Sequence, residues 1–147
     1  MREILFRGKC RETKRWYYGQ YIKLHKTTYC FEEYKDNDID QIVFEEMTDW
    51  NLPNRHLRVD VIPETIGQFT GLIDKNGKKI FEGDIVQGTI TSQWSKSVIR
   101  CEVVYIRDCF ISLEIDKMGR QWTHKLLFAK DIQVIGNIYD NQELLKN

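Results

Sequence analysis

The sequence predicts a mainly β protein, on three observations. Residues 70–86 contain two tight turns, at 76–77 and 82–84, each placed between short hydrophobic pieces. Residues 57–62 alternate between apolar and polar side chains until their last position, which is the pattern of a half-buried strand. About five short strand-like segments separated by tight turns follow between residues 69 and 135. These patterns favour a sheet architecture throughout.

Length and composition fit one compact domain, or two small ones that share a core. The chain has 147 residues, of which 41% are hydrophobic and 30% are charged. Its 22 basic and 22 acidic residues cancel, which is unlike a strongly basic nucleic-acid binder and permits association between copies. Neither a signal-peptide h-region nor an apolar run near the ~20 residues of a membrane span is visible. We therefore expect a cytoplasmic protein with no membrane partner.

The N-terminal half is predicted to begin with a hairpin that has a long basic loop. Its strands are residues 2–7 and the aromatic-rich segment 16–24, joined by the polar connection 8–15. Residues 41–47 fit a strand or one helical turn, and their periodicity does not decide between the two. Further expected elements are a β-prone segment at 27–31, a turn at 36–38, the strand at 57–62 and a short strand at 64–69.

Pro63 marks the preferred internal boundary. It separates an N-terminal β region with an acidic segment, residues 1–64, from residues 65–147, and we expect the two to pack as one compact unit. The second region reads as a small barrel of SH3-like type followed by a short C-terminal helix, with the N-terminal hairpin packed against the barrel. Its later strands are predicted at residues 98–106, 110–115, 122–128 and 131–135.

Turn chemistry supports this plan. Asn76-Gly77 suits a type I′ turn, in which both central residues take positive φ. Gly83 would let the chain reverse before the next strand, and Asp84 could accept hydrogen bonds from nearby backbone donors. Residues 140–143, Asp-Asn-Gln-Glu, have capping-box spacing ahead of two leucines, which predicts the final helix.

Charge is distributed in two blocks of opposite sign. Residues 1–26 hold eight basic and two acidic residues, whereas residues 32–50 hold eight acidic residues and only Lys35 opposing them. The two blocks could face each other, within one chain or across a subunit boundary. The acidic groups Asp36/Asp38/Asp40 and Glu45-Glu46 could bind a hard cation, but they lack a calcium-loop pattern. A solvated acidic face is the better interpretation.

Two features could form an interaction surface. The N-terminal run places basic residues beside aromatic rings, as do surfaces that bind single-stranded nucleic acid. The alternative interpretation is a solvated loop that leads into a core strand. Trp94 lies in a polar loop, where it either anchors an interface or folds back on its own barrel. The candidate residues are Lys9, Arg11, Lys14, Arg15, Trp16, Tyr18 and Trp94.

No catalytic or cofactor motif is apparent. The four cysteines, Cys10, Cys30, Cys101 and Cys109, contain no CxxC pair, and we expect reduced thiols, with Cys101 in the core and Cys109 at a turn. His25 and Cys30, with Cys10, do not have the spacing of a zinc site. Neither GxGxxG nor a P-loop motif occurs. We expect no enzymatic activity, cofactor or metal.

Three segments together resemble the YopX family of bacteriophage and prophage proteins. They are Met1–Arg7, Thr70–Val86 and Val134–Leu145, and their order and spacing match along the chain. The resemblance implies a mostly β protein with an SH3-like barrel in its C-terminal half, often assembling with itself and encoded by phage or prophage DNA. The family's biochemical role is uncharacterised, so the resemblance assigns no site residues.

Function is therefore predicted in two forms. The first is a non-enzymatic protein-interaction module that associates with itself and could also bind a host or phage protein. The alternative is a nucleic-acid-binding module that uses the basic and aromatic N-terminal run.

Overall fold

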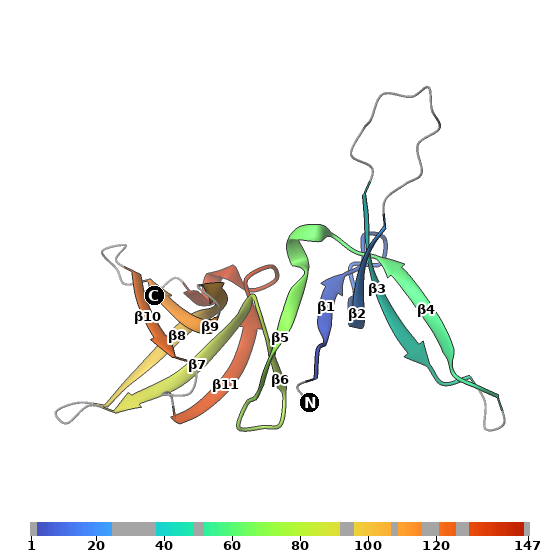
Figure 1. The fold of residues 1–147 in the computed structure, drawn as a ribbon. Coiled ribbons are helices and arrows are strands. Elements are labelled where there is room, and N and C mark those ends of the chain that lie inside the picture. The colour runs from blue at the N-terminus through green and yellow to red at the C-terminus, as the bar shows by residue number, and fades with distance from the viewer. Residues whose placement is uncertain are drawn as a thin grey trace, which may run out of the picture. The chain divides into compact units, whose positions relative to one another are not determined.

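The fold is mainly β, as predicted, and its strands form two antiparallel sheets (Figure 1). The computed structural model describes residues 3–24, 38–48, 52–91, 96–106, 109–115, 121–125 and 130–145. The chain divides into two compact units, the first comprising residues 3–68 and the second beginning at Phe69. This boundary falls within strand β5 (Gly67–Ile73).

The N-terminal unit is built on strands in the order β4-β3-β2-β1. Strand β5 enters beside β1, with which it pairs through Gly67 and Gln68. An isolated bridge between Cys10 and Val61 joins the chain after β1 to the chain after β4. The elements are β1 (Phe6–Lys9), β2 (Trp16–Leu24), β3 (Ile39–Glu46), β4 (Arg55–Asp60) and the 3-10 turn η1 (Pro63–Thr65). Residues 41–47, for which a strand and a helical turn were both possible, lie almost entirely in strand β3. The 3-10 turn η1 occupies the first part of the strand expected at residues 64–69.

One face of this sheet forms the core of the unit. Ile42 and Val61 are fully buried, and two ring pairs join neighbouring strands: Phe6 with Tyr21 at 5.6 Å between centroids, and Tyr17 with Phe44 at 5.1 Å. Opposite residues of an antiparallel pair share a face, and successive residues alternate. Tyr17 and Tyr21 of β2 therefore lie on the core face, and the even-numbered side chains of β2 point away from it.

The C-terminal unit combines a hairpin with a five-stranded sheet in the order β10-β9-β8-β7-β11. Its core contains Ile80, Val86, Cys101, Val103 and Val134, which confirms the core position predicted for Cys101. The strands are β6 (Lys79–Phe81), which pairs with β5, β7 (Asp84–Thr91), β8 (Lys96–Ile106), β9 (Cys109–Ile115), β10 (Gln121–Lys125) and β11 (Lys130–Asn137). Across the residues that the structure describes the sheets are open, so a closed SH3-like barrel is not part of the observed fold.

The turn between β5 and β6 differs from the type I′ turn predicted at Asn76-Gly77. Gly77 has a φ of 82°, whereas the φ of Asn76 is not positive. The Asp74 N–H donates to Lys78 O at 2.8 Å and the Gly77 N–H to Asp74 O at 3.0 Å, as in a three-residue loop with glycine in the left-handed position. The Asp74 carboxylate accepts from the N–H groups of Asn76 (2.7 Å) and Lys78 (2.9 Å), which favours this geometry.

The turn at Glu82-Gly83-Asp84 has the predicted chemistry. Gly83 has a φ of 76°, and Asp84 Oδ2 accepts from the Phe81 N–H at 2.8 Å. The ring of Tyr139 packs on Gly83, where an added Cβ would lie 3.1 Å from Cε2. Glycine is thus required here both by φ and by the close approach of this ring.

The short C-terminal helix predicted from the capping-box spacing is not confirmed. The described segment ends in a four-residue 3-10 turn, η3 (Gln142–Leu145). Asn137 Oδ1 accepts from the N–H groups of Tyr139 and Asp140, both at 3.0 Å, while Asn137 Nδ2 donates to Asp140 Oδ2 at 3.0 Å. Asp140, the predicted N-cap, is therefore part of a turn organised by the Asn137 side chain.

Candidate interaction surface

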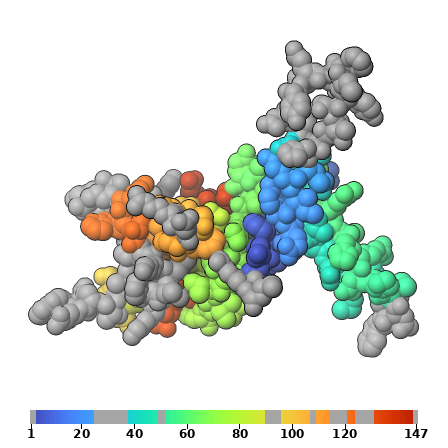
Figure 2. Space-filling view, in the orientation of Figure 1, coloured from blue at the N-terminus to red at the C-terminus, as the bar shows by residue number. Residues whose placement is uncertain are grey.

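The hairpin of β1 and β2 brings three of the predicted site residues onto one face. Lys9 lies opposite Trp16 in the antiparallel register, and Arg7 lies opposite Tyr18. All four side chains therefore share the face of the sheet that points away from the core of the unit. Tyr18 is 48% exposed, and Figure 2 shows much of β2, in blue, at the surface of the molecule.

Two cations lie over the indole ring of Trp16. The Arg7 guanidinium carbon is 4.8 Å from the ring centroid, and Lys9 Nζ is 6.0 Å from it. Cation–π contacts of this kind stabilise by about 0.5–2 kcal/mol, most when the cation is desolvated. Arg7 is only 4% exposed, so it forms a fixed support for the ring.

The connection between the strands presents the remaining basic residues of the hairpin. Cys10 N–H donates to Arg15 O at 2.9 Å and Lys14 N–H to Cys10 O at 3.1 Å, with Lys14 at a φ of 58°. Arg11 Nε donates to Val61 O at 3.1 Å, which restrains its side chain. Arg11, Lys14 and Arg15 are all exposed. We name Lys9, Arg11, Lys14, Arg15, Trp16 and Tyr18 the hairpin surface.

A group of apolar side chains that was not predicted lies further along the same face, beyond Gln20. Ile22 is 40% exposed and Leu24 is 38% exposed, both on the outward side of β2. Leu24 lies opposite Ile39 of β3, and Val43 lies on the same side of β3 beyond Gln41, which pairs with Ile22. Ile39 and Val43 are half-buried. We name Ile22, Leu24, Ile39 and Val43 the β2–β3 apolar face. The sequence gives little sign of this face, because aromatic residues occupy both the inward and the outward positions of β2. The alternation of apolar and polar residues therefore does not reveal which side of the strand is buried.

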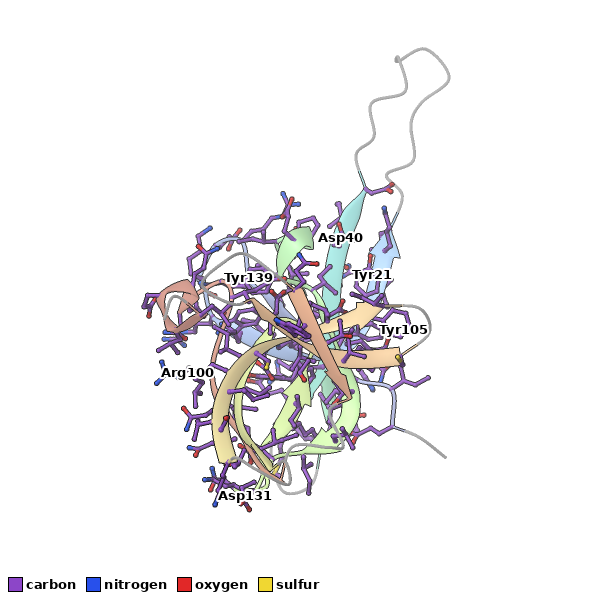
Figure 3. The ribbon with its side chains drawn as sticks, turned by 90° about the vertical axis from the view of Figure 1, so that its left-hand side faces the viewer. Tyr21, Asp40, Arg100, Tyr105, Asp131 and Tyr139 are labelled. Carbon is purple, nitrogen blue, oxygen red and sulfur yellow. The ribbon has the colours of Figure 1, made fainter. Side chains whose placement is uncertain are left out.

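Part of the acidic segment is buried or paired with other side chains of the chain, and does not form the solvated face predicted for it. Asp40 is only 7% exposed and accepts a hydrogen bond from the Tyr21 hydroxyl at 2.6 Å (Figure 3). That hydrogen bond, followed by burial, raises the pKa of Tyr21. Asp38 forms an ion pair with Lys23 at 2.9 Å, and Glu45 lies 3.3 Å from His56. These contacts place part of the acidic block against β2 and β4 of its own chain, while Asp36 lies outside the described residues.

The cysteines and histidines do not assemble into a site in the part of the chain that the structure describes. That part contains no group of three or more metal-ligating side chains. Cys10 is a buried free thiol, and a hydrogen bond from the Thr13 side chain is the main cause that lowers its pKa. Cys109 is an exposed free thiol. His25, Cys30 and the candidate Trp94 lie outside the described residues.

Among the residues that the structure describes, no helix is long and apolar enough to span a membrane.

Two of the three segments that prompted the family resemblance, the middle and the closing one, meet in the C-terminal unit, whereas residues 3–7 of the opening segment belong to the N-terminal unit. Besides the contact of Tyr139 with Gly83, the Ile138 N–H donates to Gly83 O at 2.9 Å. The Val134 N–H donates to Asp74 Oδ2 at 3.1 Å. The middle and closing segments, which are far apart in sequence, thus stabilise each other. These contacts explain by structure alone why both segments occur in one chain.

Comparison with known proteins gives a family and a structural neighbour. The family model described as YopX protein matches residues 5–146. The crystal structure of protein EF1440 from Enterococcus faecalis is similar with a TM-score of 0.54 and 23% sequence identity, over 99% of each chain. At this identity the likeness shows a shared fold alone. No curated protein matches the chain.

Proposed function

The chain belongs to the YopX family, and from this premise we propose that it is a non-enzymatic protein-interaction module that associates with itself through the β2–β3 apolar face. The observation that carries the proposal is the pair of large aliphatic side chains, Ile22 and Leu24, exposed on one side of one strand. Single exposed apolar residues are ordinary, whereas large ones that are neighbours on one face of a strand are a feature of interaction sites.

Burial of this face against a second copy would be favourable. Full burial of an isoleucine or leucine contributes about 1.5–3 kcal/mol, and these two side chains retain roughly two-fifths of their exposed surface. Two such residues on each of two copies would contribute about 3 kcal/mol on the same scale. The formal net charge of zero adds little long-range repulsion between copies. These considerations favour a self-complementary contact.

We propose further that the C-terminal unit is an incomplete SH3-like barrel. The β5–β6 hairpin supplies Leu72 and Ile80 to the core beside the five-stranded sheet. Its turn is bound to β11, where the Lys75 N–H donates to Ile132 O at 2.9 Å. Asp131, which has a φ of 61°, lies next to Ile132 at a register shift of β11 between Lys130 and Gln133. An experimental structure in which β5–β6 separates from β11 would contradict this proposal.

A phage or prophage origin and a cytoplasmic location are part of the same proposal, and both derive from the family resemblance and the sequence. The gene would then lie among phage genes, and the protein would fractionate with the cytoplasm. A chromosomal position remote from any prophage would contradict the origin, and recovery with membranes or medium would contradict the location.

We predict that the double substitution Ile22→Ser/Leu24→Ser weakens self-association about a hundredfold. The figure follows from the loss of about 3 kcal/mol of apolar burial across two copies. Light scattering behind size exclusion, over a range of protein concentrations, measures the change in mass. Serine adds no charge, so the effect would come from the lost apolar surface.

The matched control is Ile73→Ser/Val98→Ser, which removes two aliphatic side chains of 63% and 66% exposure from the C-terminal unit. It is expected to leave the assembly unchanged. A wild-type protein that remains a monomer at all concentrations would exclude the proposed function, and equal weakening by both double variants would exclude the assigned face.

A further inference from the structure

We infer that the hairpin surface binds single-stranded nucleic acid, with Trp16 and Tyr18 stacking on bases and Lys9, Lys14 and Arg15 contacting phosphates. This inference concerns a different ligand from the proposed self-association and a different part of the outward face of β2. It is carried by the arrangement of rings and cations in the described hairpin.

The two rings are placed as a stacking platform. Trp16 and Tyr18 are two residues apart on one strand and share one face, which separates their Cα atoms by about 6.6 Å. Tyr18 is 48% exposed, whereas Trp16 is half-buried and its ring is supported by the buried Arg7 guanidinium. Stacking on aromatic side chains tolerates any base, since every base has a π-face. The pair therefore suits binding with little sequence preference.

Positive charge surrounds this platform. Residues 3–24 contain six cationic residues and two acidic ones, a local excess of four in a chain whose formal net charge is zero. The exposed Lys14 and Arg15 come immediately before Trp16, and Lys9 lies opposite it. Cations beside the rings can follow the phosphates of a strand whose bases lie on those rings.

The geometry favours a single strand over a duplex. Bases can lie flat on exposed side-chain rings only when they are unstacked and unpaired. The β1–β2 hairpin presents its rings on a sheet surface, where splayed bases can reach them. Duplex binding would depend on phosphate contacts alone and would make little use of Tyr18.

Fluorescence anisotropy with a labelled deoxythymidine oligomer of roughly 12 nucleotides tests the site, a length within the range of known single-strand sites. Affinity should fall linearly in a plot of log K against log salt. Lys14→Ala/Arg15→Ala should reduce the magnitude of that slope by about 1.4, at about 0.7 for each phosphate that is no longer neutralised. Tyr18→Ala should weaken binding about tenfold while leaving the slope unchanged, and Tyr18→Phe should bind as the wild type does.

The matched control for charge is Lys75→Ala/Lys78→Ala, which removes two exposed cations from the β5–β6 turn and should leave the slope unchanged. Ile22→Ser/Leu24→Ser should retain the wild-type slope, so failure of self-association and failure of this inference can be told apart. Absence of binding at low salt, equal binding of a duplex of the same length, or an equal loss of slope in the lysine control would each overturn the inference.

Discussion

Substitution of Asp74 by asparagine is expected to lower the free energy of unfolding by about 2–3 kcal/mol at pH 7, because a buried charged acceptor loses its match to three donors. Asp74 is only 5% exposed. Its Oδ1 accepts from the N–H groups of Asn76 and Lys78, and its Oδ2 accepts from the Val134 N–H. The carboxylate thus shapes the β5–β6 turn and binds that turn to β11.

Asparagine cannot reproduce this set. Its side chain has one acceptor oxygen and one amide donor, so whichever way it is oriented, the amide nitrogen faces a backbone N–H. Either the two bonds within the turn or the single bond to β11 is lost, and a buried donor is left unsatisfied. A matched control is Asp131→Asn, an exposed position in the left-handed region that asparagine also tolerates, where a change within about 0.5 kcal/mol is expected.

The same substitution predicts a specific pH dependence. Burial acts to raise the pKa of Asp74, but hydrogen bonds from Lys78, Val134 and Asn76 outweigh it, so the folded-state pKa lies below the ordinary value of 3.8. A depressed pKa contributes stability above the unfolded-state value, and that contribution is lost as pH falls through the folded-state pKa. The difference between wild type and Asp74→Asn should therefore stay constant from pH 7 to about pH 5 and shrink below pH 3.8.

Denaturant unfolding across this pH range is the measurement. Other titrating groups change the absolute stability but cancel in the difference between the two proteins. Glu102 is such a group, since burial and then the charge of Glu82 raise its pKa. A difference that persists unchanged to about pH 2.5, well below the ordinary aspartate pKa, or equal stability at pH 7, would show that the Asp74 charge does not stabilise the turn.

Most strands could be predicted because their signals are local. Segment 16–24 coincides with β2, since aromatic and β-branched residues between turn signals suit a pleated strand. The prediction at Asn76-Gly77 was wrong because the dipeptide alone favours a type I′ turn, whereas the preceding Asp74 carboxylate captures two N–H groups of the loop. The capping-box prediction was not confirmed: Asp140 lies in a turn whose hydrogen bonds are made with the Asn137 side chain. In both cases a side-chain acceptor outside the motif determined the turn.

The candidate surface was predictable only in part. Lys9, Trp16 and Tyr18 could be identified by residue type, but their position on one face depends on the register of the β1–β2 hairpin. That register cannot be predicted from the sequence, because the loop between the two strands is long. Asp40 was read as solvated because its acidic neighbours dominate the segment. In the structure Asp40 is buried and accepts a hydrogen bond from Tyr21, 19 residues away in the sequence. Contacts between strands, unlike strand propensity, are properties of the pairing and leave little trace in a single sequence.

Substitution of Gly19 by alanine is expected to destabilise the protein by about 3 kcal/mol, the upper end for an overpacked site. An added Cβ would lie 2.0 Å from Val43 O and 2.8 Å from Val43 C, both backbone atoms of the neighbouring strand. Gly19 also ends the run of β2 that pairs with β1, and Gln20 begins the run that pairs with β3. Relief of the clash would require β2 and β3 to separate where the strand changes partner.

Gly8 provides a contrast that tests this cause. A Cβ there would meet only the Val61 side chain, at 2.9–3.1 Å. Gly8→Ala should therefore cost less, and Val61→Ala should rescue part of the loss, giving a favourable coupling of about 1 kcal/mol in a double-mutant cycle. Val43→Ala should give no rescue of Gly19→Ala, because the obstacle is a carbonyl that every residue at position 43 carries. Denaturant unfolding of the two cycles measures both couplings. Rescue of Gly19→Ala by Val43→Ala would mean that side-chain packing, rather than the approach of the two backbones, requires glycine at this position.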